Sequence, residues 1–236
     1  MVMEYKILVI NPGSTSTKIA LYSDEKEVFN ENVVHPQEEI DKLDSLIDEI
    51  PMRREHVLQA MERHALKPSA LSIVMGRGGL FPPIKSGGYK VNKAMLDLVY
   101  SGKLPAHASN LGAVLADEIA KEAGVTAYIY DAESSSDLME IAKVTGFKEI
   151  VRRSFCHVLN MRAVSRWYAQ SIGKNYEDIN LIVAHVGGGI SLSAHKNGLI
   201  IDSLSDDNGP FSPERCGNIP AMDMVEICFS GEFTKK

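Results

Sequence analysis

A short polar segment near the start of the chain follows directly on an apolar run. It reads INPGSTSTK and places Ser14, Thr15, Ser16 and Lys18 behind Asn11. Hydroxyl and backbone N–H groups can donate hydrogen bonds to phosphate oxygens, and a lysine adds positive charge. The spacings typical of a P-loop and of a dinucleotide-binding fingerprint are both absent. The segment therefore predicts a phosphate-binding loop of another kind, with a simple tight hairpin as the alternative.

A second segment, AHVGGGIS, has the same layout with glycines in place of hydroxyls. His185 ends its apolar part, and Gly187, Gly188 and Gly189 follow. Consecutive glycines let the backbone approach a ligand closely and point several N–H groups in one direction. We expect this loop to bind phosphate as well, and we expect the His185 side chain to face the ligand.

Three charged residues lie where a strand ends or where loops are rigid. Arg77 stands among glycines in GRGGL, and Arg215 lies in GPFSPERCGN, a loop rich in proline and glycine. The planar guanidinium suits anions, so two such arginines fit a doubly anionic ligand. Asp131 ends the apolar run VTAYIY, where carboxylates often hold a metal or orient a substrate. The alternatives are a surface arginine in a turn and, for Asp131, a helix cap.

Other polar side chains have weaker signals. His107 and Asn110, in PAHASN, could contact substrate or could cap the helix that follows. His157 lies in a helical segment, where a histidine is also compatible with a satisfied core or surface position. These residues become candidates only in combination with the two loops.

Alternating strands and helices must position these side chains. Strands are predicted at residues 5–10, 17–22, 27–34, 70–75 and 125–130, and helices at residues 37–50, 52–66, 93–100, 111–123 and 155–171. Helical segments follow from apolar residues at three- and four-residue spacing, and strands from short apolar runs that end at turn residues. The pattern predicts an α/β protein with a mixed sheet.

The two loops belong to an internal repeat. Residues 5–29 and 179–203 each read as strand, polar residue, small-residue loop, second strand, tight turn and third strand. In the second copy, Asn197-Gly198 is a strong signal for a two-residue hairpin. Two copies of one unit so far apart indicate two homologous domains.

The composition limits the classes of function. The chain has 236 residues, 44% of them hydrophobic, and a net charge of -6, which disfavours nucleic acid and anionic membranes as partners. Its three cysteines include no C-x-x-C pair, so we expect reduced, mostly buried thiols and a cytoplasmic location. Neither a signal peptide nor an apolar run of about 18 residues is present, so we expect no membrane association.

Five motifs together resemble one enzyme family. INPGSTSTKIALY, GRGGL, PAHASNLG, AHVGGGIS and GPFSPERCGN resemble, in this order, the butyrate kinases of the acetokinase family, from residue 5 to about residue 231. The resemblance implies two RNase H-like domains of the actin-like ATPase type, each with a mixed sheet. We assign residues 1–154 to the first domain and residues 155–236 to the second, which is then incomplete.

The resemblance also implies a reaction and its residues. ATP and a short-chain carboxylate would give ADP and an acyl phosphate with Mg²⁺, in a cytoplasmic homo-oligomer. By position in the motifs, the implied catalytic residues are Arg77, Asp131, His157, His185 and Arg215. The implied nucleotide-binding residues are Asn11, Ser14, Thr15, Ser16, Lys18, Gly187, Gly188 and Gly189. The implied substrate-binding residues are Arg77, His107, Asn110 and Arg215. The resemblance also implies that Asn11 lies near the metal.

This sequence departs from the family pattern in two places. Family members continue well beyond the last residues, FSGEFTKK, so we expect a shortened gene or expression product whose second sheet exposes apolar surface. Residues 132–136, AESSS, are more polar than the family pattern, which leaves the acyl chain open. A non-catalytic remnant that binds phosphate or a partner, and a kinase for a branched or other short acid, remain as alternatives.

Overall fold

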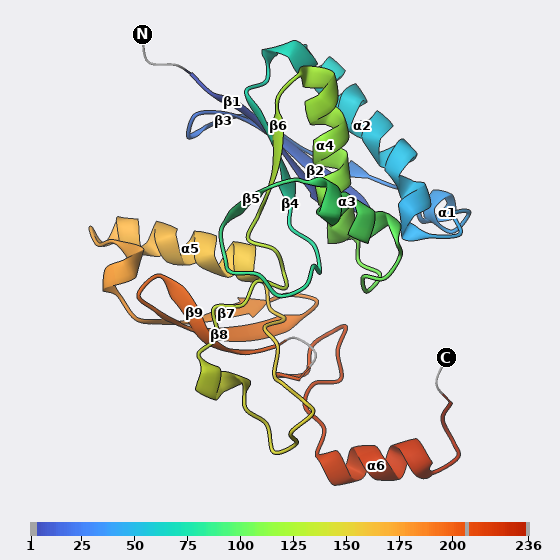
Figure 1. The fold of residues 1–236 in the computed structure, drawn as a ribbon, viewed down its shortest axis with the longest axis vertical. Helices are drawn as coiled ribbons and strands as arrows, with labels where there is room; N and C mark the ends of the chain where they lie inside the picture. The colour runs from blue at the N-terminus through green and yellow to red at the C-terminus, as the bar shows by residue number, and fades with distance from the viewer. Residues whose placement is uncertain (1–3, 206–207, 235–236) are drawn as a thin grey trace. The chain divides into compact units, whose positions relative to one another are not determined.

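The computed structural model describes residues 4–205 and 208–234. The chain forms two compact units that divide between Ser135 and Ser136, from blue to yellow-green and from yellow-green to red in Figure 1. We call residues 1–135 unit 1 and residues 136–236 unit 2. The predicted domain boundary between residues 154 and 155 falls within unit 2, and as a statement about domains it stays a prediction.

Unit 1 is built on a six-stranded mixed sheet with the strand order β3-β2-β1-β4-β6-β5. Strands β1, β4 and β6 are parallel, whereas β2, β3 and β5 pair antiparallel with their neighbours. The strands are β1 (Lys6–Pro12), β2 (Ser16–Ser23), β3 (Lys26–Val34), β4 (Ile73–Arg77), β5 (Gly88–Lys90) and β6 (Thr126–Tyr130). Asn11 lies near the end of β1 and Arg77 ends β4, and these two strands are parallel neighbours. This edge of the sheet therefore carries candidate residues of unit 1.

Two helices shape the core of unit 1. Helix α4 (Leu111–Ala123) packs on β4 and β6, and α2 (Ile50–Arg63) packs on α4, β2 and β3. Shorter elements are α1 (Gln37–Ile40), α3 (Lys93–Tyr100) and 3₁₀ turns at Leu46–Glu49, Pro68–Ala70 and Ala108–Asn110. A Cβ on Gly76 would lie 2.1 Å from the Gly112 carbonyl oxygen, so only glycine lets β4 and α4 approach this closely just before Arg77.

Unit 2 contains the second copy of the repeat. Its strands β7 (Leu181–Val186), β8 (Ile190–Lys196) and β9 (Leu199–Leu204) form an antiparallel sheet in that order, as β1, β2 and β3 do in unit 1. Its helices are α5 (Val158–Ser171) and α6 (Ala221–Phe229), with 3₁₀ turns at Glu140–Lys143 and Tyr176–Asp178. Asn197 and Gly198 have φ of 53° and 74°, as the predicted two-residue hairpin requires.

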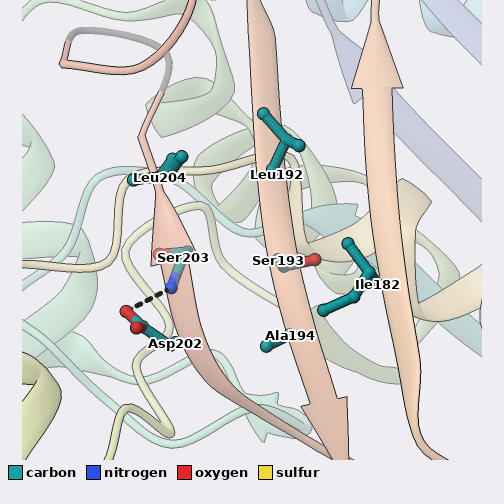
Figure 2. Close-up of a pocket in the computed structure, with 7 residues that line it drawn as sticks. All are labelled: Ile182, Leu192, Ser193, Ala194, Asp202, Ser203 and Leu204. Carbon is teal, nitrogen blue, oxygen red and sulfur yellow. Dashed lines mark hydrogen bonds between the residues drawn. The ribbon is translucent and has the colours of Figure 1, made fainter.

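The two faces of the unit 2 sheet differ in an unusual way. Strand β8 buries the polar side chains of Ser191, Ser193 and His195, and both serine hydroxyls contact Met161 of α5. The opposite face is apolar and open: Ile182 is 76% exposed and Leu204 is 48% exposed. A pocket on this sheet is lined by the seven residues drawn in Figure 2, Ile182, Leu192, Ser193, Ala194, Asp202, Ser203 and Leu204. The expected exposure of apolar surface on the second sheet is therefore confirmed.

Most predicted elements are present, and one helix was wrong. The helices at 93–100 and 111–123 have the predicted bounds, and α2 carries Pro51 in its first turn as expected. The single helix predicted from residue 37 to 50 is instead α1, a bend and a 3₁₀ turn. Ser45 is extended, and its hydroxyl donates to Asp48 Oδ2, a local hydrogen bond that competes with helix continuation. Strand β5 and helix α6 were not predicted.

Two global expectations can be compared with the structure. The three cysteines are all free thiols, but the expectation that most of them are buried was wrong, because Cys216 and Cys228 are exposed and only Cys156 is buried. Among the helices of the described residues, none combines the length and apolar character needed to cross a bilayer.

Candidate active site

The first small-residue segment forms the tip of the β1–β2 hairpin. Gly13 N–H donates to the Ser16 carbonyl over 2.7 Å and closes the turn. The side chains of Ser14, Thr15 and Lys18 are exposed, and Ser16 is half-buried. The predicted loop is therefore a hairpin whose hydroxyl groups face solvent, so the hairpin and phosphate-loop interpretations do not exclude each other.

The carbonyl groups of this loop bind the protein instead of solvent. Arg53 donates to the carbonyls of Ser14 and Ser16 over 3.1 and 3.2 Å, and His35 N–H donates to the Thr15 carbonyl over 2.8 Å. In a trans peptide the N–H points opposite to the carbonyl of the same unit, so the Thr15 amide points away from Arg53. Within the described chain, the amides of Ser14 and Thr15 donate to no protein acceptor. Two backbone donors are thus free for an anion.

Arg53 is the centre of a buried polar network that the sequence analysis missed. Its side chain is fully buried and pairs with Glu49 over 2.6 Å. It also donates to Thr17 Oγ1 over 2.9 Å, and Thr17 Oγ1 is 2.8 Å from His35 Nε2. Burial, with Arg53 and the stacked His56 ring nearby, lowers the pKa of His35 to about 4. The neutral His35 and the paired Arg53 hold the hairpin without placing a net buried charge beside it.

Arg77, at the end of β4, is close to two other polar side chains. Its Nη1 donates to Asn11 Oδ1 over 3.4 Å, and its Nη2 pairs with Glu133. The guanidinium is largely buried, and this burial lowers the pKa of Arg77 from its usual value. The structure brings together two residues that the sequence predicted for the site, Asn11 and Arg77. It adds Glu133, which the sequence marked only as part of a segment more polar than the family pattern.

The two glycines that follow Arg77 lie where neighbouring atoms leave no space for a side chain. A Cβ on Gly78 would be 2.5 Å from Ala132 Cα, and one on Gly79 would be 2.5 Å from Asn110 Oδ1. Asn110 is itself buried, accepts from Leu80 N–H over 2.7 Å and donates to the Pro105 carbonyl over 2.8 Å. Its side chain fixes two loops, and its predicted contact with substrate stays a prediction.

Asp131 follows β6 and is buried in a constrained backbone conformation. Its φ is 38°, in the left-handed region, and its Oδ1 accepts a hydrogen bond from Gly87 N–H over 2.8 Å. This bond and the one from Asp131 N–H to the Gly87 carbonyl fix the start of β5. These two hydrogen bonds between Asp131 and Gly87 support the backbone, and the predicted catalytic role of Asp131 stays a prediction.

His107 precedes a 3₁₀ turn and contacts the same glutamate as Arg77. Its Nδ1 accepts from Ser109 N–H over 3.3 Å, as a helix-capping side chain does, and lies 3.2 Å from Glu133 Oε2. The capping alternative is therefore observed, and the same side chain also lies in the cluster around Arg77.

In unit 2, the three glycines form the tip of the β7–β8 hairpin. Gly187 N–H donates to the Gly189 carbonyl over 3.1 Å. The Gly188 carbonyl accepts from Ser212 Oγ over 2.6 Å and from Glu214 N–H over 3.1 Å. As in the first hairpin, a loop carbonyl binds protein, so the amide of the same peptide unit, that of Gly189, points the other way.

Two predicted histidines stack beside this loop. The rings of His157 and His185 have centroids 3.6 Å apart and are nearly parallel, and His157 Nδ1 is 2.9 Å from Ser191 Oγ. The Asn160 amide donates to His185 Nδ1 over 3.0 Å, so the neutral ring carries its proton on Nε2. His185 Nε2 lies 3.3 Å from the position that a Cβ on Gly187 would occupy. This ring nitrogen is a donor next to the glycine loop.

Arg215 lies in the turn that holds the glycine loop. Ser212 N–H donates to the Arg215 carbonyl over 2.9 Å, and the Arg215 guanidinium donates to the Glu214 carbonyl over 2.9 Å. Its side chain is partly exposed, with 42% of its surface accessible. Unit 2 thus brings His157, His185, the three glycines and Arg215 into one neighbourhood.

The protein offers few ligands for a metal. Among the described residues, no group of three or more His, Cys, Asp or Glu side chains is arranged to hold a metal ion. The predicted ligand atom, Asn11 Oδ1, faces the cationic Arg77. Mg²⁺ usually keeps several waters and binds through substrate phosphates with only one or two protein oxygens. The donor set fits a metal that arrives with phosphate and does not fit a metal held by protein alone.

Comparison with known sequences gives the family context. Residues 125–220 match the model of the acetokinase family. The chain is 47% identical over 232 residues to butyrate kinase 1 of Clostridium acetobutylicum, covering 98% of this chain and 65% of that protein. It is 42% identical over 235 residues to a probable butyrate kinase of Clostridium botulinum, covering 99% of this chain and 66% of that protein. The chain spans about 65% of the length of these relatives.

Comparison with solved structures supports the fold. Acetate kinase of Porphyromonas gingivalis has a TM-score of 0.72 at 17% identity, covering 98% of this chain and 65% of that chain. A propionate kinase of Francisella tularensis has a TM-score of 0.68 at 17% identity, covering 98% and 65%. This similarity confirms the predicted α/β fold class, and the sheet of unit 1 is mixed as predicted. The three described strands of the unit 2 sheet pair only antiparallel, so the mixed sheet predicted for the second domain is not observed there.

Proposed function

We propose that the chain belongs to the acetokinase family and is a carboxylate kinase of the butyrate type. It would transfer the γ-phosphoryl group of ATP to butyrate or a similar short-chain fatty acid and give ADP and an acyl phosphate, reversibly. The observation that carries the proposal is the 47% identity to a butyrate kinase across 98% of this chain. The two free amides of the first hairpin loop, and the Gly189 amide that points away from the protein-bound Gly188 carbonyl in the second, support it independently of the relatives' names.

The proposed reaction needs little acid–base chemistry. A carboxylate oxygen attacks the γ-phosphorus and forms a new P–O bond, while the bond from that phosphorus to the β,γ-bridging oxygen breaks. ADP leaves with the bonding electron pair, and no proton moves because the carboxylate is already ionised at neutral pH. The protein must hold two anions in line and offset their repulsion, which is work for positioned donors and cations.

In unit 1, we assign Arg77 to the substrate carboxylate, with Asn11 beside it over 3.4 Å. The amides of Ser14 and Thr15, the hydroxyls of Ser14, Thr15 and Ser16, and the Lys18 ammonium would bind nucleotide phosphates. His107 and Asn110 would line the acyl side of the substrate site, and Asp131 would orient substrate or metal.

In unit 2, we assign the amides of Gly188 and Gly189 to phosphate oxygens, with Gly187 closing the turn. His185 Nε2–H would donate to the transferring phosphoryl group, and the stacked His157 would hold that ring in place. Arg215 would offset charge on the phosphoryl group in the transition state. The Arg215 guanidinium is partly exposed.

ATP and Mg²⁺ are the expected cosubstrate and metal. When bound, Mg²⁺ neutralises charge on the phosphate oxygens of the nucleotide. Asn11 Oδ1 is the protein oxygen that would hold it, and the remaining ligands would come from phosphate and water. From the same family membership we expect a cytoplasmic homo-oligomer, which light scattering of the purified chain would test.

A hydroxylamine trap tests the proposed activity. The chain is incubated with ATP, Mg²⁺ and a panel of straight and branched short acids, and the acyl phosphate is detected as its hydroxamate. We expect hydroxamate with butyrate. A folded sample that gives none with any acid would refute the proposed activity for this chain.

Two arginine variants test the assigned roles. Arg77→Ala and Arg215→Ala should each lose about 2–4 kcal/mol of transition-state stabilisation in kcat/KM, as for other preorganised donors. Arg54→Ala is the control, because Arg54 makes only surface pairs with Glu118 and Glu122. Near-normal rates in both site variants would refute the assignment of Arg77 and Arg215.

A further inference from the structure

Glu133 contacts the arginine that we assign to the substrate carboxylate. Its Oε1 pairs with Arg77 Nη2, while its Oε2 lies 3.2 Å from both Ser109 Oγ and His107 Nδ1. The residue is only 9% exposed. Arg77 therefore holds Oε1 and the Ser109 hydroxyl holds Oε2, so Glu133 cannot turn away from Arg77 without losing the hydrogen bond at its other oxygen.

The contact occupies the nitrogen that a second carboxylate would need. A guanidinium grips a carboxylate with two bonds through a fork of neighbouring N–H groups, and Nη2 belongs both to the fork with Nη1 and to the fork with Nε. Nη1 already donates to Asn11. Because Nη2 has one N–H in each fork, an incoming carboxylate either displaces Glu133 from its N–H or uses the other N–H of the same nitrogen, beside the Glu133 carboxylate.

The charges of Arg77 and Glu133 also disfavour a second carboxylate at this position. Arg77 and Glu133 together are neutral, so the pair attracts a further anion less strongly than a lone guanidinium would. A second carboxylate at the same nitrogen would also lie close to the Glu133 carboxylate, and like charges at such distances repel strongly when they are largely buried.

We propose that Glu133 is a specificity-determining residue that competes with the substrate carboxylate for Arg77. The substrate binds by displacing Glu133 from Nη2 or by sharing that nitrogen with it, and this competition weakens the binding of simple monocarboxylates. The inference rests on the proposed function, because it takes Arg77 as the carboxylate-binding residue.

Glu133→Gln tests the competition with little change in shape. The amide can keep the contacts to Ser109 and His107 but no longer competes as an anion. We expect the KM for butyrate to fall about tenfold, the size expected for one charge-assisted hydrogen bond, while the KM for ATP stays unchanged. Glu133→Ala should shift the KM for butyrate in the same direction, and thermal melts show whether each variant is folded.

A matched control separates this effect from a general loss of negative charge. Glu38→Gln makes the same change at an exposed position in α1 and should leave both KM values as they are. If Glu133 instead serves to position Arg77, Glu133→Gln will raise the KM for butyrate or lower kcat. That result, or an unchanged KM, would overturn the proposal.

A binding measurement keeps the inference separate from the activity. Calorimetric titration of butyrate into wild type and Glu133→Gln requires no turnover. If neither protein yields hydroxamate, the proposed activity fails, yet tighter butyrate binding by Glu133→Gln would still support the competition. Equal or weaker binding by the folded variant, or no binding to either protein, would overturn the inference even if wild type proves to be an active kinase.

Discussion

The two hairpin loops share one backbone device but are held by different parts of the molecule. In both, loop carbonyls bind protein groups and leave amides pointing the other way. The first loop is held by Arg53, a fully buried cation on α2 that has its own partner in Glu49. The second is held by neutral groups, the Ser212 hydroxyl and the Glu214 amide, in the turn that also carries Arg215.

Because of this difference, we expect changes at the support of the first loop to affect stability and changes at the support of the second loop to affect activity. Arg53 belongs to the core of unit 1, so disturbing it should cost folding free energy first. Ser212 belongs to an exposed turn next to a proposed catalytic arginine, so disturbing it should cost little stability and should mainly affect activity. The following experiments test this separation.

Arg53→Met should have the largest effect on folding. It removes three hydrogen bonds to the first hairpin and leaves Glu49 buried without its cation. Breaking one side of a buried pair in this way typically costs about 3–5 kcal/mol in the free energy of unfolding. Urea unfolding followed by circular dichroism measures it.

The neighbouring residue on the same helix is the control. Arg54→Met removes only surface ion pairs and should cost about 1 kcal/mol or less. Equal losses in the two variants would show that Arg53 is not the anchor of the first hairpin.

Acid should weaken the first hairpin's support through His35. Because the folded pKa of His35 is about 4, below the usual 6.5, the unfolded chain takes up the proton more readily. Stability is therefore unaffected by this group above about pH 6.5 and falls as the pH drops from there toward 4, by about 3 kcal/mol at most.

His35→Asn removes this titration and should flatten the stability profile between pH 6.5 and 4.5, measured by urea unfolding. His195 of unit 2, whose pKa burial also lowers to about 4, will leave a residual slope in the variant. A profile with the same slope as wild type would show that His35 does not take part.

Ser212→Ala should have the smallest effect on folding and a clear one on activity. It removes one hydrogen bond to the Gly188 carbonyl, so the stability loss should be about 1 kcal/mol. Because the same turn carries Arg215, we expect kcat/KM for the proposed reaction to fall roughly tenfold, by analogy with one weakened transition-state contact.

Ser101→Ala is the matched control, since the Ser101 hydroxyl also donates to a backbone carbonyl, that of Leu98, over 2.7 Å. It should lose similar stability and keep full activity. If both serine variants retain full activity, the second loop's support is structural, as that of the first loop is.

The sequence predicted those features that local chemistry determines. Glycine and hydroxyl residues after apolar runs predicted both hairpin tips, and the repeat predicted that they share one topology. The helix predicted at residues 37–50 was wrong because apolar spacing continues through Ser45, where side-chain hydrogen bonds favour a bend.

The residues that support the site depend on contacts between distant parts of the chain. Arg53 reaches a loop 39 residues earlier, and Glu133 reaches Arg77 over 56 residues, which no local pattern reveals. A signal for Arg53 did exist, because it lies on the face of α2 that buries Ile50 and Val57, where a charged residue requires a partner. For Glu133, the pairing of Arg77 with Tyr130 in neighbouring parallel strands brings residue 133 to the same edge of the sheet.

The central claim is that a substrate carboxylate oxygen attacks the γ-phosphorus of ATP. Butyrate labelled with ¹⁸O in its carboxylate, incubated with the chain, ATP and Mg²⁺, tests this by ³¹P NMR. We predict a butyryl phosphate signal with the isotope shift of one ¹⁸O bound to phosphorus. A butyryl phosphate signal without that shift, or no acyl phosphate from a folded sample, would contradict the account.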